Sequence, residues 1–225
     1  MSSRRGDPNK LVAGAHPGFP NGAKSALMSA AESGNAAKVE QLIDDQKADV
    51  NLKNEHGLTA LHFASTPEVA RALCERGADK EAKAFERTWG PACATPLALA
   101  IRRDSARMIK ELGSLGADLD ANDADPIKRC LDANPPKMKT LTALLEAGAS
   151  VDGLSGMPPL FHVVRRHNIA AVRFLCDAGA NLAIRCTLVA GGPAMTALGY
   201  AMSLHKNEWT GACAAELQSR GAPLA

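Results

Sequence analysis

Two pairs of adjacent arginines are the residues of this 225-residue chain best suited to bind another molecule. They are Arg102-Arg103 and Arg165-Arg166, with Lys128-Arg129 between them in the sequence. The planar guanidinium of arginine donates paired hydrogen bonds that match a carboxylate or a phosphate. We therefore interpret these residues as a cationic surface for an acidic protein segment or a phosphorylated peptide. The alternative interpretation is that the arginines only cover helix surfaces and pair with nearby acids such as Asp104 or Asp132.

A second candidate for partner recognition is the segment 85–91, which reads Phe-Glu-Arg-Thr-Trp-Gly-Pro. Aromatic residues make up 4% of the chain, yet this short segment holds Phe85 and Trp89, one of only two tryptophans. Because Trp and Arg are enriched at interface hot spots, we interpret Phe85, Arg87 and Trp89 as contact residues. The alternative interpretation is an insertion without function, because loops tolerate insertions.

The other reactive residue types form no catalytic or metal-binding pattern. The six cysteines include no Cys-x-x-Cys pair, so we expect neither a zinc site nor a disulfide framework. Cys74, Cys130 and Cys176 are interpreted as buried structural thiols. His162 and His167 are five residues apart, off the spacing that places two ligands on one helix face. With neither a phosphate loop nor a nucleophile elbow, the sequence predicts no enzyme activity, no cofactor and no metal.

A recurring short motif sets the architecture that must position these residues. It ends in Gly-Ala at 77–78, 116–117, 148–149, 179–180 and 221–222, with Lys47-Ala48 as a copy without glycine. A period in the low thirties is typical of stacked repeats. Each copy is preceded by a helix-capping residue, then Ala or Pro, and then an aliphatic residue. In one repeat a proline, Pro158, takes the cap position. The other caps are Ser25, Thr59, Thr95, Asp125 and Thr196.

Each repeat has room for two short helices and a turn. From each cap to the alanine of the next Gly-Ala there are 23, 19, 22, 24, 22 and 26 residues. Gly34-Asn35, Asp104-Ser105 or His167-Asn168 interrupts the apolar pattern midway. The glycine that follows each second helix is expected to be left-handed, so Lys47 makes the first repeat atypical. The second helices carry apolar stripes: Val39, Leu42, Ile43; Val69, Leu73, Cys74; Ile109, Leu112; Leu141, Leu144, Leu145; Val172, Leu175, Cys176.

The sequence of helix, turn, helix, Gly-Ala-Asp, a turn with Asn54 and Gly57, and then Thr-Ala-Leu-His resembles the ankyrin repeat. The match is most specific at residues 48–65 and covers about residues 23–225. It implies an all-α solenoid of stacked helix pairs with β-turn fingers, in a single domain after a disordered lead-in at residues 1–22. Two fingers, between Ala78 and Thr95 and between Ala180 and Thr196, are longer than the first. The six repeats span approximately 23–55, 56–84, 85–123, 124–154, 155–193 and 194–225.

The resemblance also implies where a partner would bind. In ankyrin-like stacks the first helices and the fingers line the concave side, and the two residues near the end of each first helix are frequent contact points. Those residues are the two arginine pairs in the third and fifth repeats. In the fourth repeat they are Asp132-Ala133, with Lys128 and Arg129 on the same helix. The corresponding residues of the other repeats are not basic: Glu32-Ser33, Ser65-Thr66 and Ser203-Leu204.

The implied function is a non-catalytic scaffold, adaptor or inhibitor that holds a protein partner in the concave groove and on the fingers. The alternative is binding of nucleic acid or another anionic surface through Arg102, Arg103, Arg165 and Arg166. The formal net charge of +2 and the lack of aromatics interleaved with arginine favour a protein partner.

The N-terminal segment and the hydropathy pattern bear on location in the cell. The sequence contains no run of about 18 apolar residues, which a membrane-spanning helix would need. It also contains no apolar signal-peptide core. Arg4 and Arg5 would suit a transit peptide, whereas Asp7 counts against one. We therefore expect the protein in the cytosol or the nucleus.

Overall fold

The computed structural model describes residues 7–13, 23–85, 95–119, 126–133, 136–153, 156–187, 192–204 and 208–224. Within these residues there are twelve α-helices and four strands of two residues each, which confirms the predicted all-α class. No helix among them is both long enough and apolar enough to span a membrane. The chain forms two compact units, 1–123 and 124–225, and the boundary falls between the third and fourth predicted repeats.

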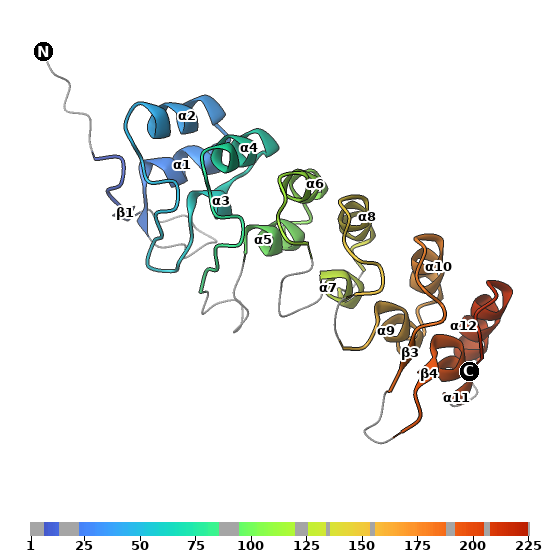
Figure 1. Cartoon of the computed structure of the whole chain (residues 1–225). Helices are drawn as coiled ribbons and strands as arrows, with labels where there is room; N and C mark the ends of the chain where they lie inside the picture. Colours follow the sequence, from blue (N-terminus) through green and yellow to red (C-terminus); the bar gives the residue numbers. More distant parts are fainter. Residues whose placement is uncertain are drawn as a thin grey trace, which may run out of the picture. The chain divides into compact units, whose positions relative to one another are not determined.

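The helices of the first unit form three consecutive pairs. The first helices of the pairs pack against one another in one layer, and the second helices form the other layer (Figure 1). A two-stranded ribbon of β1 (Val12–Ala13) and β2 (Ala23–Lys24) precedes them. The pairs are α1 (Ala26–Glu32) with α2 (Ala36–Asp44), α3 (Ala60–Phe63) with α4 (Pro67–Glu75), and α5 (Pro96–Arg102) with α6 (Ala106–Ser114).

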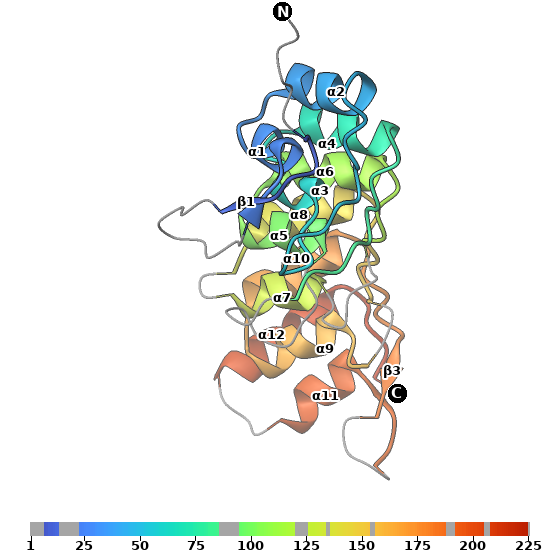
Figure 2. The same ribbon diagram turned by 90° about the vertical axis from the view of Figure 1, so that its left-hand side faces the viewer.

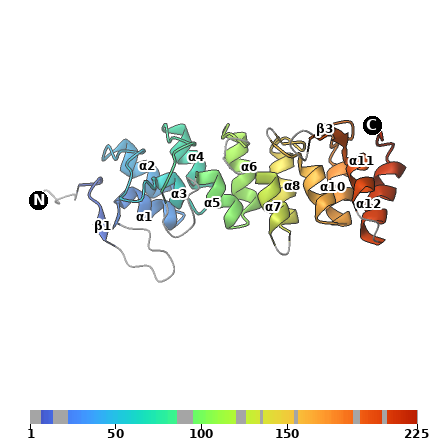
Figure 3. The same cartoon turned by 90° about the horizontal axis from the view of Figure 1, so that it is seen from below.

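The second unit repeats this arrangement. Its lengthened finger contains β3 (Arg185–Cys186), which pairs antiparallel with β4 (Met195–Thr196) and projects away from the helices of the unit (Figure 2). Within each unit the helix pairs follow one another in chain order (Figure 3). Those of the second unit are α7 (Pro126–Asp132) with α8 (Met138–Glu146), α9 (Pro159–Arg165) with α10 (Ile169–Asp177), and α11 (Ala197–Ser203) with α12 (Glu208–Ser219).

The predicted capping residues begin the first helices. The side-chain oxygens of Ser25 and Thr95 each accept a hydrogen bond from a backbone amide three residues later, with a nitrogen–oxygen distance of 3.2 Å. The hydroxyl of Thr196 accepts a similar bond at 3.1 Å. Thr59 uses a variant of the capping box, because its own amide donates to Nδ1 of His62 at 3.1 Å. Asp125 lies outside the described residues.

Left-handed residues end the helices where they were expected. The glycines of the Gly-Ala motif all have positive φ, and Lys47 takes the same conformation at φ 57°. The turns between the two helices of a pair also contain a residue with positive φ, at Gly34, Asp104 and His167. Because a residue with a Cβ is strained in this region, the three non-glycine examples are held there by the packing around them.

The apolar stripes form the core of both units, although their outer members are only half-buried. Ile43, Cys74, Leu145 and Cys176 lie at the edge of their stripes. The expectation of buried thiols is therefore correct for Cys130 and wrong for Cys74 and Cys176. Desolvation still raises the pKa of the Cys74 thiol to about 11.

Hydrogen bonds between successive turns link the repeats within each unit. In each case the amide of the residue after Gly-Ala, or its equivalent, donates to a side-chain oxygen of the preceding turn. Residues 7–13, which belong to the predicted lead-in, take part in this pattern through Asn9. The bonds run from Asp49 to Asn9, from Asp79 to Asn51 and from Asp118 to Glu81, all at 2.8 Å, and in the second unit from Asn181 to Asp152 at 2.9 Å.

The second helix pair departs from the others because α3 is short. Helix α3 has four residues, whereas α1 and α5 have seven. The assignment of Ser65-Thr66 to the end of a first helix was therefore wrong, because α3 ends at Phe63 and Thr66 is the N-cap of α4. The signal was present in the sequence, where this repeat has 19 residues from cap to alanine against 22 or more in the others.

Candidate functional site

The predicted contact residues of the first unit lie at the end of α5 and on the finger before it. Arg102 is the last residue of α5 and is half-buried, and Arg103 follows it as an exposed C-cap. The side chain of Phe85 is 72% exposed, and its amide donates to the carbonyl of His56 at 2.8 Å. Arg87 and Trp89 lie outside the described residues.

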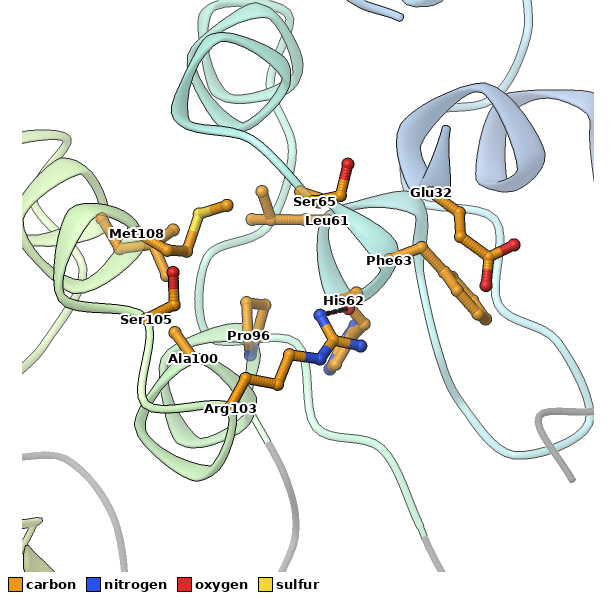
Figure 4. Close-up of a pocket in the computed structure, with 12 residues that line it drawn as sticks. Glu32, Leu61, His62, Phe63, Ser65, Pro96, Ala100, Arg103, Ser105 and Met108 are labelled. Atoms are coloured by element: carbon orange, nitrogen blue, oxygen red, sulfur yellow. Dashed lines mark hydrogen bonds between the residues drawn. The ribbon is translucent and has the colours of Figure 1, made fainter. Parts of the chain in front are cut away.

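A pocket of about 340 Å³ lies beside Arg103 in the first unit (Figure 4). Leu61, Pro96, Ala100 and Met108 provide apolar walls from α3, α5 and α6. These four residues are buried, so the walls are held by the core of the unit. Polar groups of Ser65, Ser105 and Arg103 border the same space.

The position of the pocket follows from the early end of α3. Glu32 ends α1 and Arg103 caps α5, and both line the pocket together with His62 and Ser65. Since α3 packs against α1 and α5, the pocket lies between the ends of its two neighbours, where a seven-residue α3 would have its last turn.

The side chain of Arg103 reaches from the end of α5 to the end of α3. One of its guanidinium nitrogens donates to the carbonyl oxygen of His62 at 3.3 Å. In a longer helix that carbonyl would accept an amide of the next turn, so the arginine satisfies a group that the short helix leaves at its end. On the other side, Nζ of Lys24 lies 2.7 Å from the Glu32 carboxylate and 5.0 Å from the ring centre of Phe63.

The predicted contact residues of the second unit lie on its first helices. Lys128 is half-buried and Arg129 exposed on α7, and Arg165 is exposed at the end of α9. Arg166 caps α9 and pairs with the carboxylate of Asp132 at the end of α7. Nε2 of His162 lies 2.7 Å from the same carboxylate oxygen. Arg166 therefore forms the ion pair with Asp132 that the alternative interpretation described.

The six cationic residues thus divide between the two units, with Arg102 and Arg103 in the first and the other four in the second. A single basic band across the repeats stays a prediction. What the structure does bring together is Arg103 with the pocket, and Arg166 with Asp132 and His162. Ser65, Ser105 and Met108 could not be identified as pocket residues from the sequence, where the short spacing of the second repeat was the one related signal.

The groups around the pocket are of the kinds that ligand sites in proteins use. It combines buried apolar walls, two hydroxyls and a guanidinium, and small ligand sites in proteins have this composition. The ring of His62 is already engaged, with Nδ1 2.9 Å from the hydroxyl of Thr59. The arrangement can hold an apolar group and pair with an anion beside it.

The comparisons with known proteins fit this architecture. Residues 5–84 match the family model for ankyrin repeats in three copies. The ankyrin repeat domain of Bcl-3, described as a unique member of the IκB protein family, is 25% identical and has a TM-score of 0.66, over 89% of this chain and 87% of that chain. A chain in the complex of the Bd0816 predatory endopeptidase from Bdellovibrio bacteriovorus with immunity protein Bd3460 is 26% identical and has a TM-score of 0.57, over 86% of this chain and 98% of that chain.

Proposed function

We propose that this chain, which has the ankyrin repeat fold, is a non-catalytic scaffold, adaptor or inhibitor that binds an acidic segment of a protein partner. The observation that carries this proposal is the pocket beside Arg103, where a cation adjoins buried apolar walls. Arginine is among the residues enriched at interface hot spots, which cluster in well-packed pockets.

Phe85 supports the same proposal from the finger. Its ring is largely exposed although aromatic side chains are scarce in this chain. An exposed aromatic ring supplies a large contact area at little cost in conformational entropy, so Phe85 would serve as a second anchor. Arg87 and Trp89 follow it in the same predicted finger and are proposed to share that role.

In the second unit the proposed contacts differ in strength. Lys128, Arg129 and Arg165 would pair with acidic groups of the partner. Arg166 contributes less to partner binding, because Asp132 already compensates its charge.

The comparison structures support a protein partner rather than a particular one. One similar chain comes from a complex of an endopeptidase with an immunity protein. Inhibition of a partner is therefore one form that the proposed activity could take, alongside tethering.

The test is affinity capture from separate cytosolic and nuclear extracts, with two baits. One bait is the intact protein, and in the other Arg102, Arg103, Arg165 and Arg166 are changed to Glu. A charge-matched control changes four exposed basic residues away from these positions, Lys38, Lys53, Arg107 and Lys139, to Glu. We expect one dominant protein to be lost with the first variant and retained with the control.

Two outcomes would contradict the proposal. Retention of the dominant protein by the four-arginine variant would reject these arginines as the contact residues. Capture of nucleic acid, with binding that weakens steeply as salt rises, would favour the anionic-surface alternative instead.

A further inference from the structure

We propose that the pocket beside the short α3 is the docking site for one peptide motif of the partner. In this motif an aliphatic or methionine side chain enters the pocket, and a neighbouring Asp or Glu pairs with Arg103. The inference rests on the proposed function and specifies the chemistry of the segment that is bound.

The first step is that the pocket is a built feature of the repeat. From the cap of the first helix to the cap of the second there are 10 residues in the first and third repeats (35−25 and 105−95), but 7 in the second (66−59). The three absent residues are those that would complete α3 and its turn. The hydrogen bonds from Asp79 to Asn51 and from Asp118 to Glu81 hold the neighbouring turns in register, so the repeats do not close over the gap.

The second step concerns what fits inside. Leu61 and Ala100 are each 3% exposed and Met108 is 6% exposed, so the walls exist before a ligand arrives. A volume of about 340 Å³ lies at the lower end of the ~300 to 1,000 Å³ typical of ligand sites. The space thus suits one or two side chains rather than a large cofactor. Met108 adds a flexible wall that can adapt to an aliphatic or thioether group.

The third step concerns the charge at the mouth. Glu32 and Arg103 are the acidic and basic residues that line the pocket, and Glu32 is paired with Lys24 at 2.7 Å. Glu32 is thus engaged by Lys24, and Arg103 places a guanidinium at the mouth of the pocket. One nitrogen of this guanidinium donates to the carbonyl of His62, and a guanidinium has five N–H groups in all. The exposed position of Arg103 allows it to form a charge-assisted pair with a carboxylate as well.

The fourth step favours an extended peptide over an isolated small anion. The hydroxyls of Ser65 and Ser105 border the pocket. The Ser65 hydroxyl donates to the carbonyl of Ala31 at 3.3 Å, so it can accept from a main-chain amide of the bound segment, and the Ser105 hydroxyl can also bond that main chain. An inorganic anion would leave the apolar walls uncovered. Carboxylate and side chain must therefore belong to the same ligand.

The experiment begins with a display library of random dodecapeptides, selected on the full chain. Synthetic copies of the enriched peptides are then titrated by fluorescence polarisation. We expect the enriched peptides to share an aliphatic or methionine residue within a few positions of an acidic residue.

Two pocket variants test where these peptides bind. A long-helix variant carries Ala-Gln-Ser inserted after Ala64 together with Ser65→Gly, an uncharged version of the end of α1 at residues 31–34. Ser65→Trp fills the pocket from its rim without changing chain length, and Ser33→Trp at the exposed end of α1 is its control. Circular dichroism and thermal unfolding confirm that each variant is folded. Both pocket variants should bind the peptides at least about tenfold more weakly than the intact chain, and Ser33→Trp should bind them unchanged.

The charge is tested with Arg103→Gln against Arg107→Gln, a change at an exposed arginine of α6 outside the predicted contact residues. We expect the first to weaken binding about tenfold and to lose the preference for acidic peptides, and the second to change little. Equal binding to the pocket variants and the intact chain would overturn the inference while leaving the proposed function in place. Enriched peptides without the motif, or none at all, would also overturn it, and the capture experiment would decide the proposed function separately.

Discussion

Arg166 and Asp132 form an ion pair between the ends of two successive first helices, α9 and α7. Arg103 has the same place in its own repeat and also reaches back toward the preceding first helix. Helix α3 ends too early to present a side chain there, and the guanidinium bonds the carbonyl of His62 at its end. A double arginine after a first helix therefore has a structural role in one unit and borders a pocket in the other.

Asp132 contacts both Arg166 and His162, so we expect a loss of stability when its carboxylate is removed. Asp132→Asn should lower the free energy of unfolding by about 1 kcal/mol, because it weakens both the pair with Arg166 and the hydrogen bond to the largely buried His162. Arg166→Gln should cost less, since that pair is half-exposed. Urea titration of the single and double variants measures both effects, and additive losses would show that the two residues do not act together.

Gly148, the left-handed glycine after α8, allows the cost of the backbone conformation to be measured without a steric clash. A Cβ at Gly148 would meet no atom within 4 Å, so Gly148→Val should destabilise only through its φ of 103°, by ~1 to 2 kcal/mol. Gly211, in α12 of the same unit, is the control. There, Gly211→Ala should stabilise by ~0.5 to 1 kcal/mol. An unchanged melting curve for Gly148→Val would contradict the role assigned to this residue.

Lys47 gives the reverse prediction. It holds the left-handed position at φ 57° without being glycine. Lys47→Gly should relieve that strain and raise the free energy of unfolding by roughly 1 kcal/mol. The expected result is a higher melting temperature, and a lower one would mean that the lysine side chain contributes more than its backbone costs.

Glu216 predicts an acid-sensitive contribution to stability. A hydrogen bond from Arg173 at 2.9 Å, with a second from Arg220 at 3.0 Å, holds the pKa of the Glu216 carboxyl below its ordinary value. Because the folded pKa is the lower one, this stabilisation is complete above the ordinary pKa of glutamate and is lost as pH falls through the folded pKa. Thermal unfolding from neutral to acidic pH should show a smaller acid dependence for Glu216→Gln. The same pH dependence in both proteins would contradict the assignment.

Features set by nearby residues could be read from the sequence. Thr95 and Gly148 were assigned correctly because a helix cap and a left-handed end depend on local backbone chemistry. Arg166 could not be assigned, because its partner Asp132 belongs to the preceding repeat and the choice between partner binding and pairing depends on how two helices pack. The pocket was visible only as a shortened spacing. Chain length reveals that residues are absent, but whether the neighbours close over the gap is decided by their own contacts.

The hydrogen bonds between successive turns have a consequence for how such a chain can change over time. They fix the spacing of adjacent repeats through Asn51 and Glu81, at positions remote from the ends of the first helices. A deletion in one helix is therefore absorbed where it occurs, and the repeats on either side need no compensating substitutions. A stack of this kind can acquire a new cavity by losing a single helical turn, which is a short mutational route to a new specificity.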